Sequence, residues 1–253
     1  MAKRGPQFGQ SDEFPHVRLF SWGGPVTELR AVLWDMDGTL IDSEEFHWLS
    51  WREAMANEGI VISREQFLSS FGQRNDSIIS QWLGPAATAE RIDHIANTKE
   101  ELYRDLIRKH GISPLPGVTY WVRTLHTRGW LQAIASAAPR ANIDVVLKTL
   151  GAAHAFQAIV SAEDVHHGKP DPEVYVLAAA RLGVPADKCI VMEDAAAGIA
   201  GARSAGMRTI GVGHNAEFLD AEVAVRFLDF LQTDAFERLL QNTPDPAIKP
   251  VPA

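Results

Sequence analysis

Residues 30–43 read Arg-Ala-Val-Leu-Trp-Asp-Met-Asp-Gly-Thr-Leu-Ile-Asp-Ser, and this stretch decides the fold. Residues 31–34 form a run that is apolar at every position, and Asp35 and Asp37 come directly after it. A short strand that is apolar on both faces is typical of a parallel sheet covered by helices on both sides. The stretch therefore predicts a buried first strand that ends in carboxylates.

Similar apolar runs recur along the chain and alternate with helical patterns. The runs cover residues 131–135, 158–160, 189–192 and 209–212. The helices expected between them cover residues 141–150, 172–182 and 195–205. A glycine follows each helix where a left-handed C-terminal cap would lie, at Gly151, Gly183 and Gly206. The alternation predicts an α/β fold built on a doubly wound parallel sheet.

Residues 44–112 break this alternation. They are poor in strand patterns and rich in amphipathic helical ones, at residues 47–57, 64–70, 77–83 and 89–110. We predict that residues 44–112 form a helical cap domain inserted after the first strand, and that residues 28–43 and 113–240 form the catalytic core. We predict that residues 1–27 are an N-terminal extension and that the proline-rich residues 241–253 are a loose tail.

The composition excludes several classes of protein. The net charge of −8 leaves no basic excess to neutralise the phosphates of a nucleic acid. The single cysteine, Cys189, excludes an internal disulfide and fits a reducing compartment. No apolar run approaches the roughly 18–20 residues needed to cross a bilayer, and the N-terminal residues carry Asp12 and Glu13 where a signal peptide would be apolar. We expect a cytoplasmic monomer with a small-molecule substrate and neither a nucleic-acid nor a membrane partner.

Polar side chains gather where the predicted strands end. They are Asp35 and Asp37 after the first strand, Ser136 after the second, Asp164 and Lys169 after the third, and Glu193 and Asp194 at the end of the fourth. Ligands of open parallel sheets bind outside the carboxyl ends of the strands. Clustered carboxylates raise one another's pKa unless a cation lies between them. Oxygen ligands of this kind predict Mg²⁺.

Four motifs in this order resemble those of the haloacid dehalogenase superfamily. They are Asp35-x-Asp37-Gly-Thr-Leu-x-Asp42-Ser43, Ser136 at a strand end, Lys169-Pro-Asp-Pro172, and Glu193-Asp194 with Gly198. One DxD motif is weak evidence, whereas four ordered motifs on the expected elements are specific. The resemblance covers about residues 30–212, and the helical insertion is similar to the caps of the β-phosphoglucomutase-like and phosphatase branch.

The resemblance implies an Mg²⁺-dependent phosphoryl transfer on a Rossmann-like core. Asp35 would attack phosphorus and form an aspartyl-phosphate, and Asp37 would act as general acid and then as general base. Ser136 and Lys169 would bind and neutralise the phosphoryl group. The residues implied as Mg²⁺ ligands are Asp35, Asp37 through its backbone carbonyl, Asp194, and Glu193 directly or through water. Asp37 disfavours a dehalogenase or a phosphonate-cleaving enzyme, because those relatives lack an acid at this position.

The predicted cap sets the substrate. Four residues resemble specificity elements of the mutase branch, namely Ser43, His47, Arg74 and Lys99. Arg74 could grip a distal phosphate with two hydrogen bonds. The loop at residues 136–140, Ser-Ala-Ala-Pro-Arg, resembles sugar-phosphate phosphatases instead. We predict a phosphatase acting on a small phosphorylated sugar or polyol. The alternatives are a β-phosphoglucomutase-type phosphomutase and a non-catalytic binding module on the same fold, which the intact set of acids disfavours.

Several of these residues also have a plainer interpretation. Arg74 and Lys99 could belong to a solvated helix face, and Asp164 could be a loop acid rather than part of the site. Cys189 begins a buried strand and is expected to be inert. No metal-binding set is evident around His166 and His167.

Overall fold

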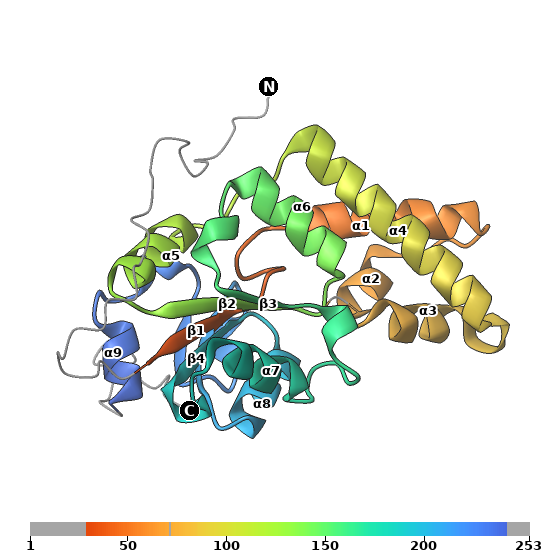
Figure 1. Cartoon of the computed structure of the whole chain (residues 1–253). Coiled ribbons are helices and arrows are strands. Elements are labelled where there is room, and N and C mark those ends of the chain that lie inside the picture. Colours follow the sequence, from red (N-terminus) through yellow and green to blue (C-terminus); the bar gives the residue numbers. More distant parts are fainter. Residues whose placement is uncertain (1–28, 71, 242–253) are drawn as a thin grey trace.

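A parallel sheet with helices on both faces forms the centre of the fold (Figure 1). The computed structural model describes residues 29–70 and 72–241. The predicted extension at residues 1–27 and nearly all of the predicted tail at 241–253 lie outside the described residues.

Six strands make up the sheet in the described part of the chain, in the order β3-β2-β1-β4-β5-β6, and every neighbouring pair is parallel. The strands are β1 (Ala31–Trp34), β2 (Leu131–Ala135), β3 (Ala158–Val160), β4 (Cys189–Glu193), β5 (Arg208–Val212) and β6 (Val223–Val225). β1 lies between β2 and β4, with Trp34 opposite Ile134 on one side and Met192 on the other. The predicted doubly wound sheet is confirmed, and β1 is central to it.

The side chains of each strand point alternately to the two faces of the sheet. Both faces of β1 are apolar, and helices cover both of them. Val32 and Trp34 pack in the core that includes α5 (Val118–Thr127), α6 (Arg140–Leu150) and α9 (Ala235–Leu240). Ala31 and Leu33 pack in the opposite core. The helices on that side are α7 (Glu173–Leu182) and α8 (Ala196–Ser204). All four residues of β1 are fully buried, as their apolar run predicts.

Strand β6 and helix α5 belong to the core but left no clear pattern in the sequence. β6 has only three residues, and two of them are half-buried. A strand of this length is too short to show a recognisable apolar pattern in the sequence. α5 begins with Val118, Thr119, Tyr120 and Trp121, which are β-branched and aromatic residues of modest helix propensity. Packing of Trp121 and Val122 into the core favours the helix despite these propensities.

In the described part of residues 44–110, four α-helices lie beside the sheet (Figure 1). They are α1 (Glu44–Asn57), α2 (Arg64–Ser70), α3 (Asn75–Leu83) and α4 (Ala89–His110). They enclose a cluster of their own around Trp51, Phe67 and Ile79. α4 extends beyond it, because Tyr103 and Ile107 belong to the large core on the α5 and α6 side of the sheet. α4 therefore connects the two packing units.

In the described residues no helix combines the length and the apolar character that a membrane span requires.

Candidate active site

Three carboxylates and one lysine meet at the C-terminal edge of the central strands. Asp35 directly follows β1, and Glu193 and Asp194 come at the end of β4. One oxygen from each of these three residues lies within 4.8 Å of the others. Nζ of Lys169 lies 2.5 Å from Oδ1 of Asp35 and 2.9 Å from Oε1 of Glu193. The structure thus brings together four of the predicted site residues from three separate segments.

Among the described residues, Lys169 is the cation in contact with these three carboxylates, so it offsets only part of their negative charge. Burial and the neighbouring Glu193 raise the pKa of Asp35 to about 8, against the opposing effect of Lys169. Burial, Glu193 and Asp35 likewise raise the pKa of Asp194 well above its ordinary value. Burial would lower the pKa of Lys169, but Asp35 and Glu193 outweigh it and raise that pKa. A divalent cation would remove this excess of negative charge, and the oxygen donors suit Mg²⁺.

Two glycines leave the space that these carboxylates occupy. A Cβ at Gly38 would lie 2.0 Å from Oδ2 of Asp194, and Gly38 also has a left-handed backbone with φ of 81°. A Cβ at Gly198, on α8, would lie 1.6 Å from Oε1 of Glu193. No other residue type fits either position without displacing a site carboxylate.

Asp37 lies in a different environment from Asp35. Its Oδ1 accepts hydrogen bonds from the hydroxyl of Ser43 at 2.5 Å and from the hydroxyl of Tyr103 at 3.2 Å. Nε2 of His47 lies 3.1 Å from the same oxygen. Burial would raise the pKa of Asp37, but His47 and Ser43 outweigh it and lower that pKa. The ionised form of Asp37 is therefore favoured.

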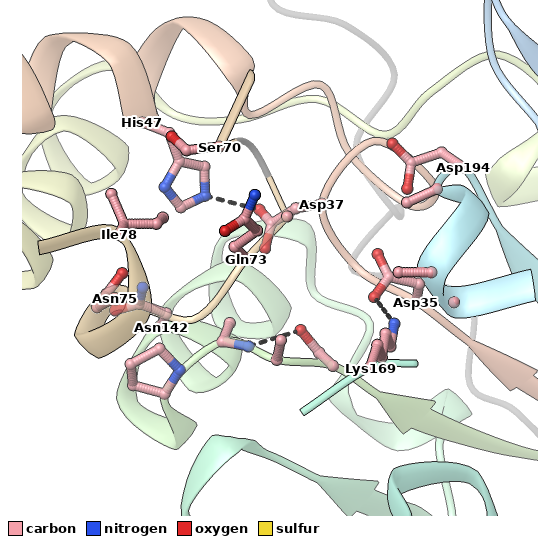
Figure 2. Close-up of a pocket in the computed structure, with 18 of the residues that line it drawn as sticks. Asp35, Asp37, His47, Ser70, Gln73, Asn75, Ile78, Asn142, Lys169 and Asp194 are labelled. Atoms are coloured by element: carbon pink, nitrogen blue, oxygen red, sulfur yellow. Dashed lines mark hydrogen bonds and ion pairs between the residues drawn. The ribbon is translucent and has the colours of Figure 1, made fainter. Parts of the chain in front are cut away.

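Ser43, His47 and Lys99 form a chain of contacts that leads away from Asp37. Ser43 is the N-cap residue of α1, and His47 lies one turn further along that helix. Nδ1 of His47 is 2.9 Å from Nζ of Lys99, and the His47 ring stacks on Tyr103 with centroids 4.1 Å apart. Lys99 is only 2% exposed, so its interpretation as a solvated lysine is wrong. Figure 2 shows the His47 ring pointing toward Asp37, with a dashed line that marks their contact.

Ser136 follows β2 and faces the same cavity as Asp35. It is buried, and its hydroxyl oxygen accepts a hydrogen bond from the backbone N–H of Ala138 at 3.1 Å. The cavity has a volume of about 100 Å³. Small-molecule sites usually measure roughly 300–1,000 Å³, so this cavity is smaller than a typical site of that kind.

The cavity is also lined by polar residues that the sequence did not predict as site residues. Glu100 is buried and contacts Asn75 on α3 and Asn142 on α6. Gln73 also lines the cavity. These residues match no motif, and their convergence depends on the packing of α3, α4 and α6.

Arg74 is the N-cap residue of α3 and does not line this cavity. Its Nε lies 3.3 Å from Oδ1 of Asp76. Its stem contacts the loop before Lys169, because a Cβ at Gly168 would lie 2.8 Å from Cδ of Arg74. Nη1 of Arg74 is buried without a hydrogen-bond partner among the described residues.

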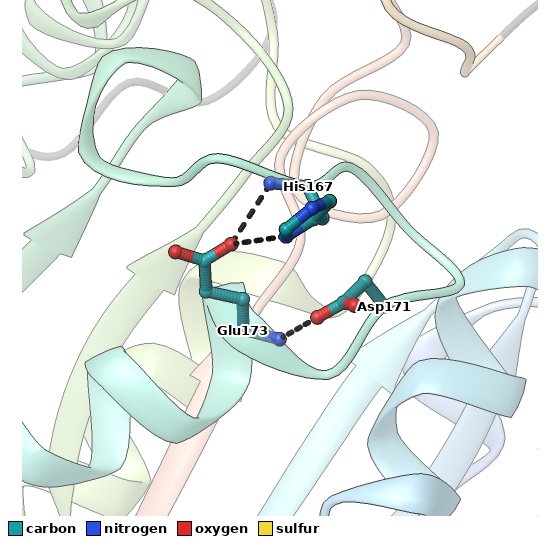
Figure 3. Close-up of side chains that lie close together, drawn as sticks. All are labelled: His167, Asp171 and Glu173. Carbon is teal, nitrogen blue, oxygen red and sulfur yellow. Dashed lines mark hydrogen bonds and ion pairs between the residues drawn. The ribbon is translucent and has the colours of Figure 1, made fainter.

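A second group of possible metal ligands lies near His167 (Figure 3), where none was expected. Oε2 of Glu173 accepts the backbone N–H of His166 at 2.9 Å and of His167 at 2.8 Å. Oδ1 of Asp171 accepts the backbone N–H of Glu173 at 2.9 Å. Asp171 thus satisfies a backbone donor at the start of α7, whereas Glu173 satisfies two donors in the loop before it. Pro172 is the N-cap of α7, so the helix begins at Glu173 and not at residue 172 as predicted. These hydrogen bonds of Asp171 and Glu173 fix the loop that carries Lys169.

Asp164 and Cys189 have structural roles. Asp164 accepts hydrogen bonds from the backbone and hydroxyl of Ser161 and forms an ion pair with Arg181, so it is a loop acid. Cys189 is buried, and burial raises the pKa of its thiol to about 12. A thiol of this kind is inert at neutral pH, as predicted.

Comparisons with known proteins agree with this geometry. Residues 32–212 match the family described as haloacid dehalogenase-like hydrolase. The chain is 34% identical over 183 residues to a fructose-1-phosphate phosphatase of Escherichia coli, covering 72% of this chain and 95% of that protein. It is 33% identical over 207 residues to the β-phosphoglucomutase of Bacillus subtilis, covering 78% of this chain and 89% of that protein.

Among solved structures, a β-phosphoglucomutase from Clostridium difficile superposes with a TM-score of 0.77 at 26% identity, covering 85% of this chain and 98% of that one. The protein CbbY from Rhodobacter sphaeroides, solved with phosphate, gives a TM-score of 0.75 at 26% identity, covering 83% of this chain and 99% of that one. The match of sequence, fold and acidic strand ends leads to one conclusion: this chain belongs to the haloacid dehalogenase-like hydrolase family.

Proposed function

We propose that this protein is an Mg²⁺-dependent phosphatase that removes phosphate from a small phosphorylated sugar or polyol. The observation that carries the proposal is the separation of two aspartates at the end of β1. Asp35 faces Lys169, Glu193 and Asp194, whereas Asp37 faces Ser43 and His47. Two carboxylates in contrasting surroundings suit two roles, a nucleophile and a proton-transfer group.

In the proposed first step, a carboxylate oxygen of Asp35 attacks phosphorus and the bond from phosphorus to the ester oxygen breaks. Asp37 donates a proton to the leaving alkoxide. In the second step, Asp37 takes a proton from water as that water attacks the aspartyl-phosphate. The contacts of Asp37 favour its ionised form, which is the form that this second step requires. The proton that Asp37 takes from water in the second step is the one that it donates in the first step of the next cycle, and His47 contacts the same carboxylate oxygen at 3.1 Å.

Asp35, Asp194, the backbone carbonyl of Asp37 and Glu193 would hold the Mg²⁺ ion. When bound, the ion supplies positive charge for the phosphoryl oxygens and offsets the three carboxylates. Lys169 contributes to the same end through its contacts with Asp35 and Glu193. Ser136 would donate its hydroxyl to a phosphoryl oxygen.

We further propose that residues 44–112 act as a cap over a core of residues 28–43 and 113–240. Support comes from the separate apolar cluster within α1 to α4 and from the small cavity between these helices and the sheet edge. Opening would admit the substrate, and closure would exclude bulk water. A cytoplasmic monomer with no nucleic-acid or membrane partner remains our expectation, based on the acidic charge and the single cysteine.

Ser43, His47, Arg74 and Lys99 are proposed to act in substrate binding. Ser43 and His47 position Asp37, and Lys99 positions His47. Arg74 is proposed on the basis of its unpartnered Nη1 and its contact with the loop that leads to Lys169.

A β-phosphoglucomutase-type phosphomutase is the second candidate. The similarity to the B. subtilis enzyme favours it. A mutase must protect its aspartyl-phosphate from water until a sugar hydroxyl arrives, whereas a phosphatase only has to admit water.

The test is ³¹P NMR of the protein with Mg²⁺ and a panel of sugar and polyol phosphates, with the Asp35→Asn variant as control. The panel includes β-glucose 1-phosphate with a trace of its 1,6-bisphosphate. Release of inorganic phosphate from several esters would support the phosphatase. Conversion of β-glucose 1-phosphate to the 6-phosphate without free phosphate would identify a mutase. The absence of both reactions, together with no binding of Mg²⁺, would favour a non-catalytic module.

A further inference from the structure

The end of the cavity that lies away from Asp35 is built from one carboxylate and side-chain amides. Figure 2 shows Asn75 and Asn142 at the opposite end of the cavity from Asp194. Glu100, on α4, lines the same end and lies between these two amides. Glu100 is 6% exposed and Asn142 is fully buried, so this is an ordered part of the interior.

The contacts fix the orientation of all three side chains. Oε1 of Glu100 accepts hydrogen bonds from Nδ2 of Asn75 at 2.6 Å and from Nζ of Lys99 at 2.8 Å. Oε2 of Glu100 accepts one from Nδ2 of Asn142 at 2.5 Å. Oδ1 of Asn142 accepts one from Nη1 of Arg104 at 3.0 Å, which settles the direction of that amide.

Hydrogen-bonding capacity remains after these contacts are counted. A carboxylate offers about four acceptor positions, and each amide nitrogen carries two N–H donors. Glu100 uses three acceptor positions in the described contacts, and each asparagine uses one donor on Glu100. A hydroxyl group both donates and accepts, so it can donate to Glu100 and accept from an adjacent amide.

The charge at this end does not suit a phosphate. Burial would raise the pKa of Glu100, but Lys99, His47 and Asn75 outweigh it and hold that pKa at about 2, so the side chain is ionised. Nζ of Lys99 is already shared between Glu100 and His47. A phosphate here would lie beside the Glu100 carboxylate, whose partner Lys99 is already engaged, and bringing like charges together costs free energy.

We propose that Glu100, together with Asn75 and Asn142, selects the unphosphorylated end of the substrate by binding its hydroxyl groups. The inference rests on the proposed phosphatase function and narrows its substrate class. The substrate is a polyol or sugar that carries one phosphate, and a second phosphate at the far end is disfavoured. Glu100 is then a specificity residue, distinct from the residues that act on phosphorus.

The plainer role of Glu100 is to neutralise Lys99, and the two roles predict different kinetics. Loss of a counter-charge would slow every substrate alike. Loss of a hydroxyl-binding carboxylate would slow only substrates with distal hydroxyls, because a polar site discriminates strongly against analogues that lack its partner group.

The experiment compares kcat/KM, with Mg²⁺, for a hexitol monophosphate, hexyl phosphate and a hexose bisphosphate. The variants are Glu100→Gln and Asn75→Ala, and the control is Glu101→Gln, an exposed residue on the same helix. In Glu100→Gln, the ratio of hexitol phosphate to hexyl phosphate should fall by about 10-fold. The ratio of bisphosphate to hexitol phosphate should rise in the same variant. Glu101→Gln should leave both ratios unchanged.

Circular dichroism of each variant checks that it folds. If Glu100→Gln does not fold, Asn75→Ala carries the test, with an expected fall of about 3-fold in the first ratio. An equal slowing of all three substrates would overturn this inference and leave the phosphatase in place. Failure of the unaltered protein to release phosphate from any of the esters would instead overturn the proposed function, and this inference with it.

Discussion

The α-carbon of Gly198 lies against the carboxylate of Glu193, so that a Cβ at Gly198 would be 1.6 Å from Oε1. Gly198 is on α8, where alanine would normally stabilise the helix by about 1 kcal/mol relative to glycine. Gly198→Ala should instead displace Glu193 and weaken Mg²⁺ binding by at least about 10-fold, an effect typical of residues that orient metal ligands. Isothermal titration with Mg²⁺ measures this directly.

The matched control for Gly198→Ala is Ala200→Ser, which alters an exposed position on the same helix. It should bind Mg²⁺ like the unaltered protein. Equal Mg²⁺ affinity in Gly198→Ala and Ala200→Ser would mean that Glu193 is not needed for the metal.

Asp35→Asn should abolish turnover and leave the fold intact. The amide is almost isosteric with the carboxylate and its Oδ1 can still accept a hydrogen bond from Lys169, which now lies 2.5 Å away. It cannot act as a nucleophile, so kcat should fall by at least about 1,000-fold. Rapid-quench assays with a ³²P-labelled ester would show no phosphorylated protein. Residual turnover near the original rate, with unchanged circular dichroism, would exclude Asp35 as the nucleophile.

Arg74→Ala tests the proposed role of Arg74 in substrate binding. Its Nη1 is buried without a partner among the described residues, beside the loop that leads to Lys169. A phosphoryl oxygen would satisfy this donor, so KM should rise by about 10-fold with little change in kcat. Steady-state kinetics on a monophosphate and a bisphosphate give the readout. A larger increase for the bisphosphate would assign Arg74 to a distal phosphate, and an unchanged KM for both would remove it from the binding site.

The sequence was sufficient to predict the sheet and the acids at its edge. The apolar runs define β1 to β5, and in a parallel sheet the strand ends coincide, so Asp35 and Glu193 had to converge. Lys169 lies in the loop between β3 and α7 and was expected at the site from its motif, and it contacts both carboxylates. Glycines at fixed positions carried further information, because Gly198 is required by the volume of Glu193.

The sequence could not predict the distal end of the cavity. Glu100 contacts Asn142 across 42 residues of chain, and the two side chains meet only because α4 packs on α6. The same applies to Lys99, whose position on a charged helix suggested exposure until the packing of α1 on α4 buried it against His47. Helix packing between distant segments leaves no local sequence pattern.

Gln132 is a buried polar residue in β2, and its replacement should destabilise the core. Its Oε1 accepts a hydrogen bond from Nε1 of Trp34 at 3.1 Å, and its Nε2 donates to the carbonyl oxygen of Val122 at 3.0 Å. Gln132→Ala leaves both groups buried and unpaired, which should lower the free energy of unfolding by about 2–4 kcal/mol. Urea unfolding followed by tryptophan fluorescence and circular dichroism measures the change. Gln81→Ala, at an exposed position on α3, is the control. A loss below about 0.5 kcal/mol, the level of a surface substitution, would contradict this account.

Asp164 should make stability depend on pH in the acid range. Its hydrogen bond and ion pair with Arg181 lower its pKa below the ordinary value of 3.8, and the backbone and hydroxyl of Ser161 add to the effect. Because the pKa of Asp164 is lower in the folded chain, its contribution to stability is fully present above the ordinary pKa of 3.8. This contribution is lost as the pH falls through the folded-state pKa. Asp164→Asn should therefore be less stable than the unaltered protein by about 1 kcal/mol at pH 7, and the difference should shrink below about pH 4. The control is Asp144→Asn, which removes an exposed ion pair with Arg140 in which Asp144 is 57% exposed, so its effect should be small at every pH. If the difference in stability between Asp164→Asn and the unaltered protein stays constant from pH 2 to 7, the contacts of Asp164 do not depend on its charge.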